Sequence, residues 1–194
     1  DGAGGDPCIS LGGLVHDASG EITMRLPWGA RVVRESEAVV RLPDGRSGPV
    51  EGELIAAALR PLAFPANGTA ACETAARWLG APYLWGGITL GGVDCSGLVQ
   101  GVWKLHGRLI PRDSDQQFAQ GTEVPMKSDG AGYEAGDLLF FAERGRVSHV
   151  ALWAGAGRIV HSALSRGGVG GDHLFGDEPR MKRLREGLVG VRRL

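Results

Sequence analysis

Cys95 has the sequence context of a nucleophilic cysteine. It stands in Asp94-Cys95-Ser96-Gly97, directly after a glycine-rich loop and at the expected start of a helix. Unpaired backbone N–H groups and the positive end of a helix dipole stabilise a thiolate, so this position predicts a lowered thiol pKa. The same N–H groups are suited to bind the oxyanion that forms when sulfur attacks a carbonyl. On position alone, a small buried hydrophobic residue stays open as the alternative.

Two histidines have the placement that a base and its orienting partner need. Alternation along the expected strands 147–153 and 158–163 places His149 and His161 on otherwise apolar faces. An odd-length turn between the strands makes them direct cross-strand neighbours, whereas an even one shifts them by one residue, and the sequence leaves this register open. The other histidines lack such a context and are expected to be structural: His16, His106 and His173.

Composition limits the kind of protein that this chain can form. It has 194 residues, of which 43% are hydrophobic and 22% charged, so one or two small globular domains with a sizeable core are expected. The 21 Lys and Arg against 22 Asp and Glu give a net charge of -1, and we therefore expect no nucleic-acid partner. The longest apolar stretch, 54–64, is broken by Arg60 and Pro61, and no membrane span is expected.

Cysteine usage argues against a disulfide framework and against a zinc site. The three cysteines, Cys8, Cys72 and Cys95, are odd in number, and neither a Cys-x-x-Cys pair nor clustered histidines occur. The chemistry proposed for Cys95 requires no metal and no cofactor. The basic end of the chain, 179–194, is interpreted as a solvated face, with a nucleic-acid site as the alternative.

Short elements before residue 60 and longer ones after residue 69 must position these side chains. Strands expected at 22–26, 30–33 and 38–42, separated by Pro and Gly turns, predict a small β-barrel over residues 1–60. An irregular extension wrapped on the main domain is the alternative. Residues 61–68, which carry Pro61, Pro65 and Asn67-Gly68, have the composition of a linker.

The remaining chain, 69–194, is predicted to pack helices on an antiparallel sheet. A helix capped by Thr69 and ending near Leu79 would bury Cys72, and a second helix would run from Asp94 or Cys95 to Gly107. Its buried stripe is expected at Leu98, Val102 and Leu105. Strands expected at 137–142, 147–153 and 158–163 form an antiparallel meander, which makes the fold class α+β.

Six sequence blocks between about residues 69 and 165 occur in an order that is specific to one family. They are Gly80 to Gly87 (GAPYLWGG), Val93 to Val99 (VDCSGLV), Ile110 to Gln117 (IPRDSDQQ), Gly136 to Phe141 (GDLLFF), Ser148 to Leu152 (SHVAL) and Ile159 to Ser162 (IVHS). With these blocks the chain resembles the NlpC family of bacterial cell-wall cysteine peptidases, compact relatives of papain. The resemblance implies a papain-like catalytic domain with a cysteine-bearing helix packed on an antiparallel sheet.

The resemblance also implies roles for single residues and a substrate. Cys95 would be the nucleophile, His149 its base and His161 the polar residue that orients His149. The bond cut would join γ-D-glutamate to a diamino acid in a peptidoglycan-derived peptide, which is the expected partner of a monomeric enzyme. The residues expected to line the site and contact substrate are Tyr83 near the oxyanion, with Asp94, Ser96, Asp113 and Ser114.

Residues 1–60 are similar to the bacterial SH3-like barrels that precede such domains, above all in the block 41–50. Because the linker is short and carries two prolines, the barrel is expected to pack beside the cleft and wall off one side. A walled site favours released peptides whose free L-Ala ammonium is held by an acidic group; an open groove is the alternative. The candidate acids are Asp94, Asp113, Glu35 and Glu37.

Two other functions remain open at the level of sequence. One is a papain-like amidase or acyltransferase acting on another amide, and the second is a cell-wall-binding protein without activity. The sequence does not fix the compartment: a recycling role favours the cytoplasm, whereas a removed signal peptide would place the protein outside it.

Overall fold

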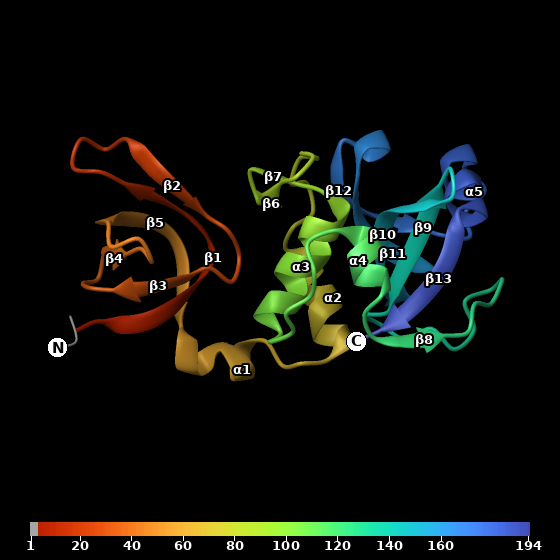
Figure 1. Ribbon diagram of the computed structural model, residues 1–194, viewed down its shortest axis with the longest axis horizontal. Helices are drawn as coiled ribbons and strands as arrows, with labels where there is room; N and C mark the ends of the chain where they lie inside the picture. Colours follow the sequence, from red (N-terminus) through yellow and green to blue (C-terminus); the bar gives the residue numbers. More distant parts are fainter. Residues whose placement is uncertain (1–3) are drawn as a thin grey trace.

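The computed structural model describes residues 4–194, which form a β-barrel followed by an α+β unit (Figure 1). The barrel is a five-stranded antiparallel sheet in the order β2-β1-β3-β4-β5, closed by pairing of β1 with β5. Its strands are β1 (Asp6–His16), β2 (Ile22–Leu26), β3 (Arg31–Arg34), β4 (Val39–Arg41) and β5 (Ser47–Ala56). The predicted fold class, α+β with a small N-terminal barrel, is confirmed.

Glycines allow the long strands β1 and β5 to close the barrel. The register between them shifts between Ser10 and Gly13, where Gly52 adopts a φ of +140°. A Cβ on Gly52 would collide with the backbone of Gly12 and Gly13, so only glycine fits at this irregularity. The three strands expected from the sequence appear as β2, β3 and β4, whereas β1 and β5 lack clean alternation and were not predicted.

The α+β unit consists of short helices packed on a six-stranded sheet in the order β12-β11-β10-β9-β13-β8. The strands are β8 (Thr122–Val124), β9 (Leu138–Glu143), β10 (Arg146–Gly155), β11 (Arg158–Ala163), β12 (Gly168–His173) and β13 (Leu188–Arg193), with a hairpin of β6 (Ile88–Thr89) and β7 (Gly92–Val93). The helices are η1 (Ala57–Leu59), α1 (Arg60–Ala63), α2 (Gly68–Ala76), α3 (Cys95–Leu105), α4 (Ser114–Phe118), η2 (Leu164–Arg166) and α5 (Pro179–Glu186). The predicted antiparallel meander is present as β9, β10 and β11.

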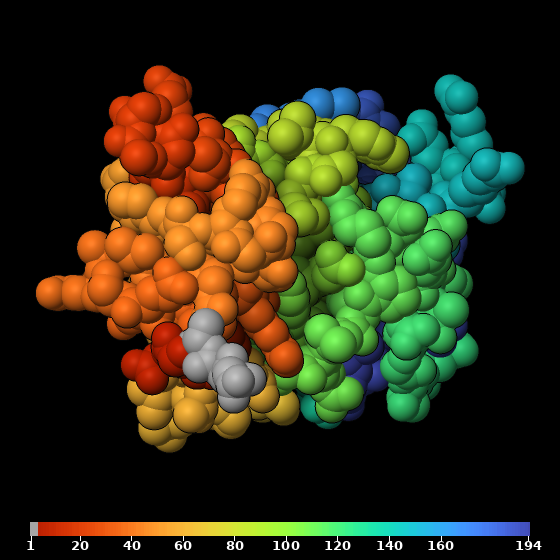
Figure 2. Space-filling view, turned by 60° about the vertical axis from the view of Figure 1, so that its left-hand side comes forward, coloured from red at the N-terminus to blue at the C-terminus, as the bar shows by residue number. Residues whose placement is uncertain are grey.

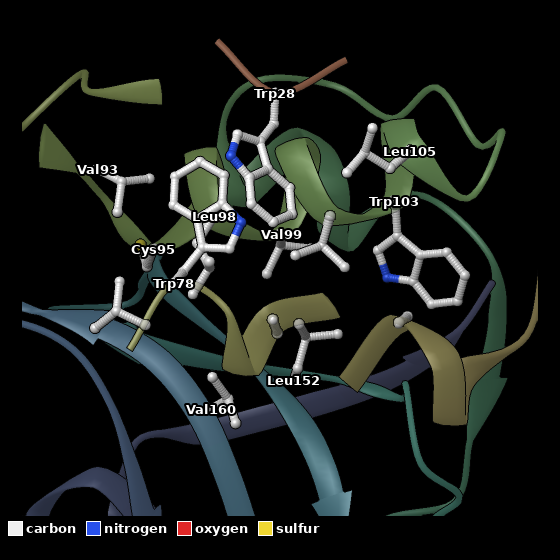
Figure 3. Packing of buried hydrophobic residues seen from close by; sticks show 14 of the residues in the cluster. Trp28, Trp78, Val93, Cys95, Leu98, Val99, Trp103, Leu105, Leu152 and Val160 are labelled. Atoms are coloured by element: carbon white, nitrogen blue, oxygen red, sulfur yellow. The ribbon is translucent and has the colours of Figure 1, made fainter. Parts of the chain in front are cut away.

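Helix α3 lies in the centre of the molecule and is buried on both sides. Leu98, Val102 and Leu105, the predicted stripe, are fully buried. They belong to one hydrophobic cluster with Phe140 and Leu152 of the sheet, and Figure 3 shows Leu98, Leu105 and Leu152 within this cluster. Burial of such side chains contributes roughly 1.5–3 kcal/mol each and fixes the helix against β10 and β11.

The barrel packs on the opposite side of α3 through a tryptophan pair. Trp28 is only 3% exposed, and its ring centroid lies 5.0 Å from that of Trp78. Arg77 stacks on Trp28 at 5.0 Å and binds Glu53 of the barrel at 2.7 Å. In Figure 3 Trp28 reaches from the barrel to the helices, and Figure 2 shows the barrel (red to orange) directly against the green segments. The barrel and the α+β unit therefore share one core.

Helix α2 differs from the expected helix in its start, end and buried face. Asn67 is the cap, accepting a hydrogen bond from the Ala70 N–H at 2.9 Å, so the prediction of Thr69 was wrong. The buried face is displaced by one residue because Trp78 anchors it, which leaves Leu79 54% exposed. Cys72 lies at the edge of this face, half-buried, and its thiol donates to the Trp153 carbonyl at 3.1 Å.

Two stretches expected to be irregular or exposed contain regular structure. The segment around the linker holds η1 and α1, which continue directly from β5. The basic end of the chain forms α5 and then β13, which lies inside the sheet between β9 and β8. Val191 is fully buried and Arg193 binds Asp137 at 2.8 Å, so interpreting this stretch as solvated surface was wrong for β13.

Docking of the barrel through Trp28 yields a stability prediction. Trp28→Ala is expected to lower the free energy of unfolding by about 3 kcal/mol, because it leaves a cavity between Trp78 and α3. Trp85→Ala, which removes an indole that is 83% exposed, should change it by less than about 0.5 kcal/mol. Urea unfolding followed by circular dichroism measures both; equal stabilities of the two variants would contradict shared packing.

Candidate active site

Cys95 occupies the first position of α3, where the helix end meets strand β10. Asp94 caps the helix by accepting a hydrogen bond from the Gly97 N–H at 2.7 Å. The Cys95 Sγ lies 4.0 Å from the carbonyl oxygen of Ser148 and interacts with the backbone of Val150. The thiol therefore contacts the backbone on both sides of His149.

The loop before Cys95 is held against the start of α3 by glycines. A Cβ on Gly97 would collide with the carbonyl oxygen of Gly87, so the absence of a side chain at Gly97 admits the loop backbone. Gly86 adopts a φ of +76° and donates its N–H to Asp94 at 2.8 Å. The glycine-rich loop thus fixes the approach to the thiol.

His149 and His161 are joined by a direct hydrogen bond. The His149 Nε2 lies 2.8 Å from the His161 Nδ1, and the rings meet nearly edge to face. Leu152 of β10 pairs with Val160 of β11. When this register is continued along the two strands, the histidines lie diagonally on one face, neither directly opposite nor one residue apart. This geometry leaves the Nδ1 of His149 as the ring nitrogen that can serve as a base.

A carboxylate that the sequence analysis missed extends this pair. The His161 Nε2 lies 2.9 Å from the Oδ2 of Asp172, which is on β12, next to β11. Alternation along residues 168–173 would have placed Asp172 on the face of His161, had the glycine-rich run been recognised as a strand. The structure therefore contains a continuous line of three polar side chains.

Burial sets the charge state of the cysteine and its neighbouring histidine. Burial, with a smaller contribution from the adjacent His161, lowers the pKa of His149 from about 6.5 to about 3. Burial also raises the pKa of the Cys95 thiol above its usual value, although backbone groups at Val150 and Ser96 oppose this. The lowered thiol pKa expected from the helix terminus is therefore not found. A neutral thiol and a neutral imidazole are the resting forms.

Asp94 is clamped by an arginine that the sequence analysis did not single out. Arg112 donates to both carboxylate oxygens, at 2.9 Å to Oδ1 and 2.6 Å to Oδ2, and to the Ser96 hydroxyl at 2.9 Å. Burial alone would raise the pKa of Asp94, but the hydrogen bonds from Arg112 and the Gly97 N–H lower it overall. Asp94 thus remains charged, and its carboxylate is occupied by Arg112 and the Gly97 N–H.

The other predicted substrate contacts differ in their burial and in the groups with which they interact. Tyr83 is close enough to Cys95 and Asp94 that burial and these two neighbours raise its pKa. Asp113 interacts electrostatically with Arg112, and its carboxylate has no hydrogen-bond partner among residues 4–194. Ser114 is buried at the start of α4. The structure therefore brings Tyr83 and Asp94 near Cys95 and Asp113 near Arg112.

Neither a metal-binding cluster nor a membrane-spanning helix occurs in the described part of the chain. Residues 4–194 contain no group of three or more His, Cys, Asp or Glu side chains arranged to hold a metal ion. Within the same residues, every helix is too short or too polar to cross a bilayer.

Comparison with known proteins assigns the family. A model of the NlpC/P60 family matches residues 80–187, which span the glycine-rich loop, α3, both histidines and Asp172. The chain belongs to the NlpC/P60 family. The family resemblance predicted from the six sequence blocks is thereby confirmed.

Individual NlpC/P60 relatives show how far the similarity extends. The chain is 36% identical over 152 residues to a gamma-D-glutamyl-L-lysine dipeptidyl-peptidase of Bacillus subtilis, which covers 77% of this chain and 43% of that protein. It therefore spans less than half of that relative. The crystal structure of an NlpC/P60 family protein from Bacillus cereus superposes with a TM-score of 0.74 at 26% identity, over 97% of this chain and 63% of that one. The NlpC/p60 domain of the peptidoglycan hydrolase SagA gives a TM-score of 0.53 at 28% identity, over 66% of this chain and 99% of that one.

The lowered pKa of His149 yields a prediction about stability against pH. Between about pH 3 and 6.5 the unfolded chain binds a proton at His149 that the folded chain does not, so stability falls as the pH drops through this window. Between pH 6 and 5 the free energy of unfolding should drop by about 1 kcal/mol more in the wild type than in His149→Ala.

Urea unfolding at each pH measures this difference, with His173→Ala as the control because His173 is exposed. The control should follow the wild type. If His149→Ala also follows the wild type, burial does not lower the pKa of His149.

Proposed function

We propose that the chain is a cysteine peptidase that hydrolyses the bond between γ-D-glutamate and a diamino acid in peptidoglycan peptides. The observation that carries the proposal is the position of the Cys95 thiol against the backbone on either side of His149, which is itself bonded to His161. The named activity of the Bacillus subtilis relative supports the choice of bond.

The proposed reaction begins with a neutral pair. As the Cys95 sulfur attacks the γ-carbonyl carbon, its proton passes to the Nδ1 of His149, and a C–S bond forms. The C–N bond then breaks, and His149 returns the proton to the leaving amine of the diamino acid. Water, deprotonated by His149, cleaves the thioester and releases the γ-carboxylate together with the thiol.

Stabilisation of the negative oxygen is assigned to groups at the start of α3. The backbone N–H groups of Cys95 and Ser96 interact with the Cys95 sulfur and are proposed to bind the oxyanion, whereas the Gly97 N–H is already bonded to Asp94. Tyr83, whose phenol interacts electrostatically with Cys95 and Asp94, is proposed as a further donor. The raised pKa of Tyr83 keeps its hydroxyl protonated and able to donate.

The barrel is proposed to form one wall of the substrate cleft. Its segment at Gly12 approaches Leu90 in the β6–β7 hairpin, which leads directly into Cys95. Such a wall suits a released peptide with a free N-terminal L-Ala. Asp113, whose carboxylate has no hydrogen-bond partner within residues 4–194, is the best candidate to hold the ammonium, because the Asp94 carboxylate is already paired with Arg112.

The barrel carboxylates considered from sequence receive less support. Glu35 binds Arg41 at 2.9 Å within the barrel. Glu35 and Glu37 lie between β3 and β4, which Figure 1 shows on the side of the barrel away from α3. The ammonium is therefore assigned to the catalytic unit.

We also propose a division into a barrel at 1–60, a linker at 61–68 and a peptidase domain at 69–194. The last barrel strand, β5, ends at Ala56, and α2, the first helix packed on the sheet, begins at Gly68. The family match over residues 80–187 lies inside the third segment.

Removing the thiol tests the proposed function. Cys95→Ala should abolish cleavage of L-Ala-γ-D-Glu-L-Lys, at least a thousandfold in kcat/KM, while circular dichroism stays unchanged. Cys72→Ser is the matched control, because Cys72 is a half-buried cysteine with its pKa raised by burial to about 11. It should keep most of the activity. Undiminished turnover by Cys95→Ala would refute the assignment.

Blocking the substrate amine tests the walled site. The N-acetylated peptide should be cleaved with a kcat/KM at least tenfold below that of the free peptide, because it carries no ammonium for Asp113 or Asp94 to bind. Asp113→Asn should reduce this discrimination. Similar kcat/KM values for both peptides would show an open groove instead.

A further inference from the structure

Asp172 lies at the far end of the histidine pair and is held from three directions. Its side chain is 5% exposed, and its Oδ2 accepts from His161. Its Oδ1 accepts from Arg166 at 2.7 Å and from Arg180 at 2.5 Å. Arg166 comes from η2 and Arg180 from α5, so two elements outside β12 each contribute an arginine that binds this carboxylate.

The glycine-rich sequence of β12 makes this arrangement sterically accessible. Gly170 pairs with His161 across the strands, and a Cβ on Gly170 would overlap the guanidinium of Arg166. Arg166 therefore crosses β12 over a residue without a side chain to reach Asp172. This accounts for the glycine at position 170.

The charges around Asp172 keep it ionised. Burial alone would raise its pKa, but the hydrogen bonds from His161 and Arg180 and the charge of Arg166 lower the pKa below its ordinary value. An ionised carboxylate only accepts hydrogen bonds. The nitrogen of His161 that faces it, Nε2, must therefore carry a proton.

The proton on the His161 Nε2 determines which nitrogens of His161 and His149 carry the other protons. A neutral imidazole with its proton on Nε2 presents Nδ1 as an acceptor. The Nε2 of His149, 2.8 Å away, must then be the donor of the bond between the histidines. A neutral His149 with its proton on Nε2 has a lone pair on Nδ1, which is the form that takes a proton from a thiol.

We propose that Asp172 is a positioning residue of the catalytic site, which selects the base form of His149 by fixing the tautomer of His161. The inference rests on the peptidase function proposed above. Arg166 and Arg180 serve it by orienting the carboxylate so that Oδ2 faces His161. A merely structural Asp172 would link β12 to α5 without affecting the proton positions.

Asp172→Asn separates these roles, because both arginines donate to Oδ1. The amide oxygen of the new side chain would accept from the two arginines, and its NH2 group would face His161. The His161 Nε2 must then accept a hydrogen bond, so the proton of His161 would lie on Nδ1. His149 would be forced to accept at Nε2 and to point a proton toward Cys95. We expect kcat to fall by about 100-fold and KM to change by less than about threefold.

Asp137→Asn is the matched control for this experiment. Asp137 is also a buried carboxylate bound by an arginine, Arg193, but lies at the start of β9 away from the histidines. Its variant should keep kcat within about threefold of the wild type. A kcat of Asp172→Asn within threefold of the wild type, or equal losses in both variants, would overturn the proposal.

Nitrogen NMR of histidine reads the tautomers directly and needs no substrate. In Cys95→Ala labelled with ¹⁵N-histidine, His161 should show a protonated Nε2 and a bare Nδ1, and adding Asp172→Asn should reverse the two. A bare Nε2 with Asp172 present would overturn the proposal without any substitution at position 172, and so would the absence of reversal in a folded Asp172→Asn variant. This readout also distinguishes failure of the inference from failure of the proposed function, which would appear as absent cleavage with the expected tautomers.

Discussion

Burial of α3 between two packing surfaces is the constraint on which the rest of the structure depends. On one side Leu98 and Val102 pack on the sheet, and on the other the barrel contributes Trp28 through Trp78. The helix therefore cannot slide or tilt without disrupting both interfaces, since protein interiors are close-packed. Its first residue, Cys95, is held at a fixed place against β10, and the catalytic geometry follows from the core.

Two buried carboxylates, each bound by arginine, flank the thiol and its histidines. Asp94 is fixed by Arg112 on the loop side, and Asp172 by Arg166 and Arg180 on the sheet side. The former caps α3 and ties the glycine-rich loop to it, while the latter ends the line of histidines. Buried ion pairs of this kind contribute little net stability, so their contribution here is to orientation. Both sides of the site are thereby preorganised before substrate binds.

Local patterns predicted the parts of the site that depend on local sequence. The start of α3 at Cys95, its buried stripe and the meander that carries His149 and His161 follow from capping, helical spacing and alternation, and all are present. The strand register was not predictable, because the register shift near Gly155 alters the alignment of the two strands. The diagonal contact of the histidines depends on that register.

Features that depend on contacts between distant segments could not be predicted. Asp172 and Arg180 belong to a glycine-rich run and a basic tail, whose patterns indicate turns and solvated surface. The pKa of Cys95 is raised because the whole fold buries it, which outweighs the local effect of the helix terminus. Likewise, Trp78 determines the buried face of α2 because Trp28 of the barrel packs on it, a contact that no local pattern records.

Cleavage of L-Ala-γ-D-Glu-L-Lys in H₂¹⁸O, followed by mass spectrometry of the products, tests the account most directly. Hydrolysis through a Cys95 thioester predicts L-Ala-D-Glu carrying one ¹⁸O in its new γ-carboxyl group, together with unlabelled lysine. Cleavage between L-Ala and D-Glu, transfer of the acyl group to an added amine in place of water, or no cleavage at all would contradict it.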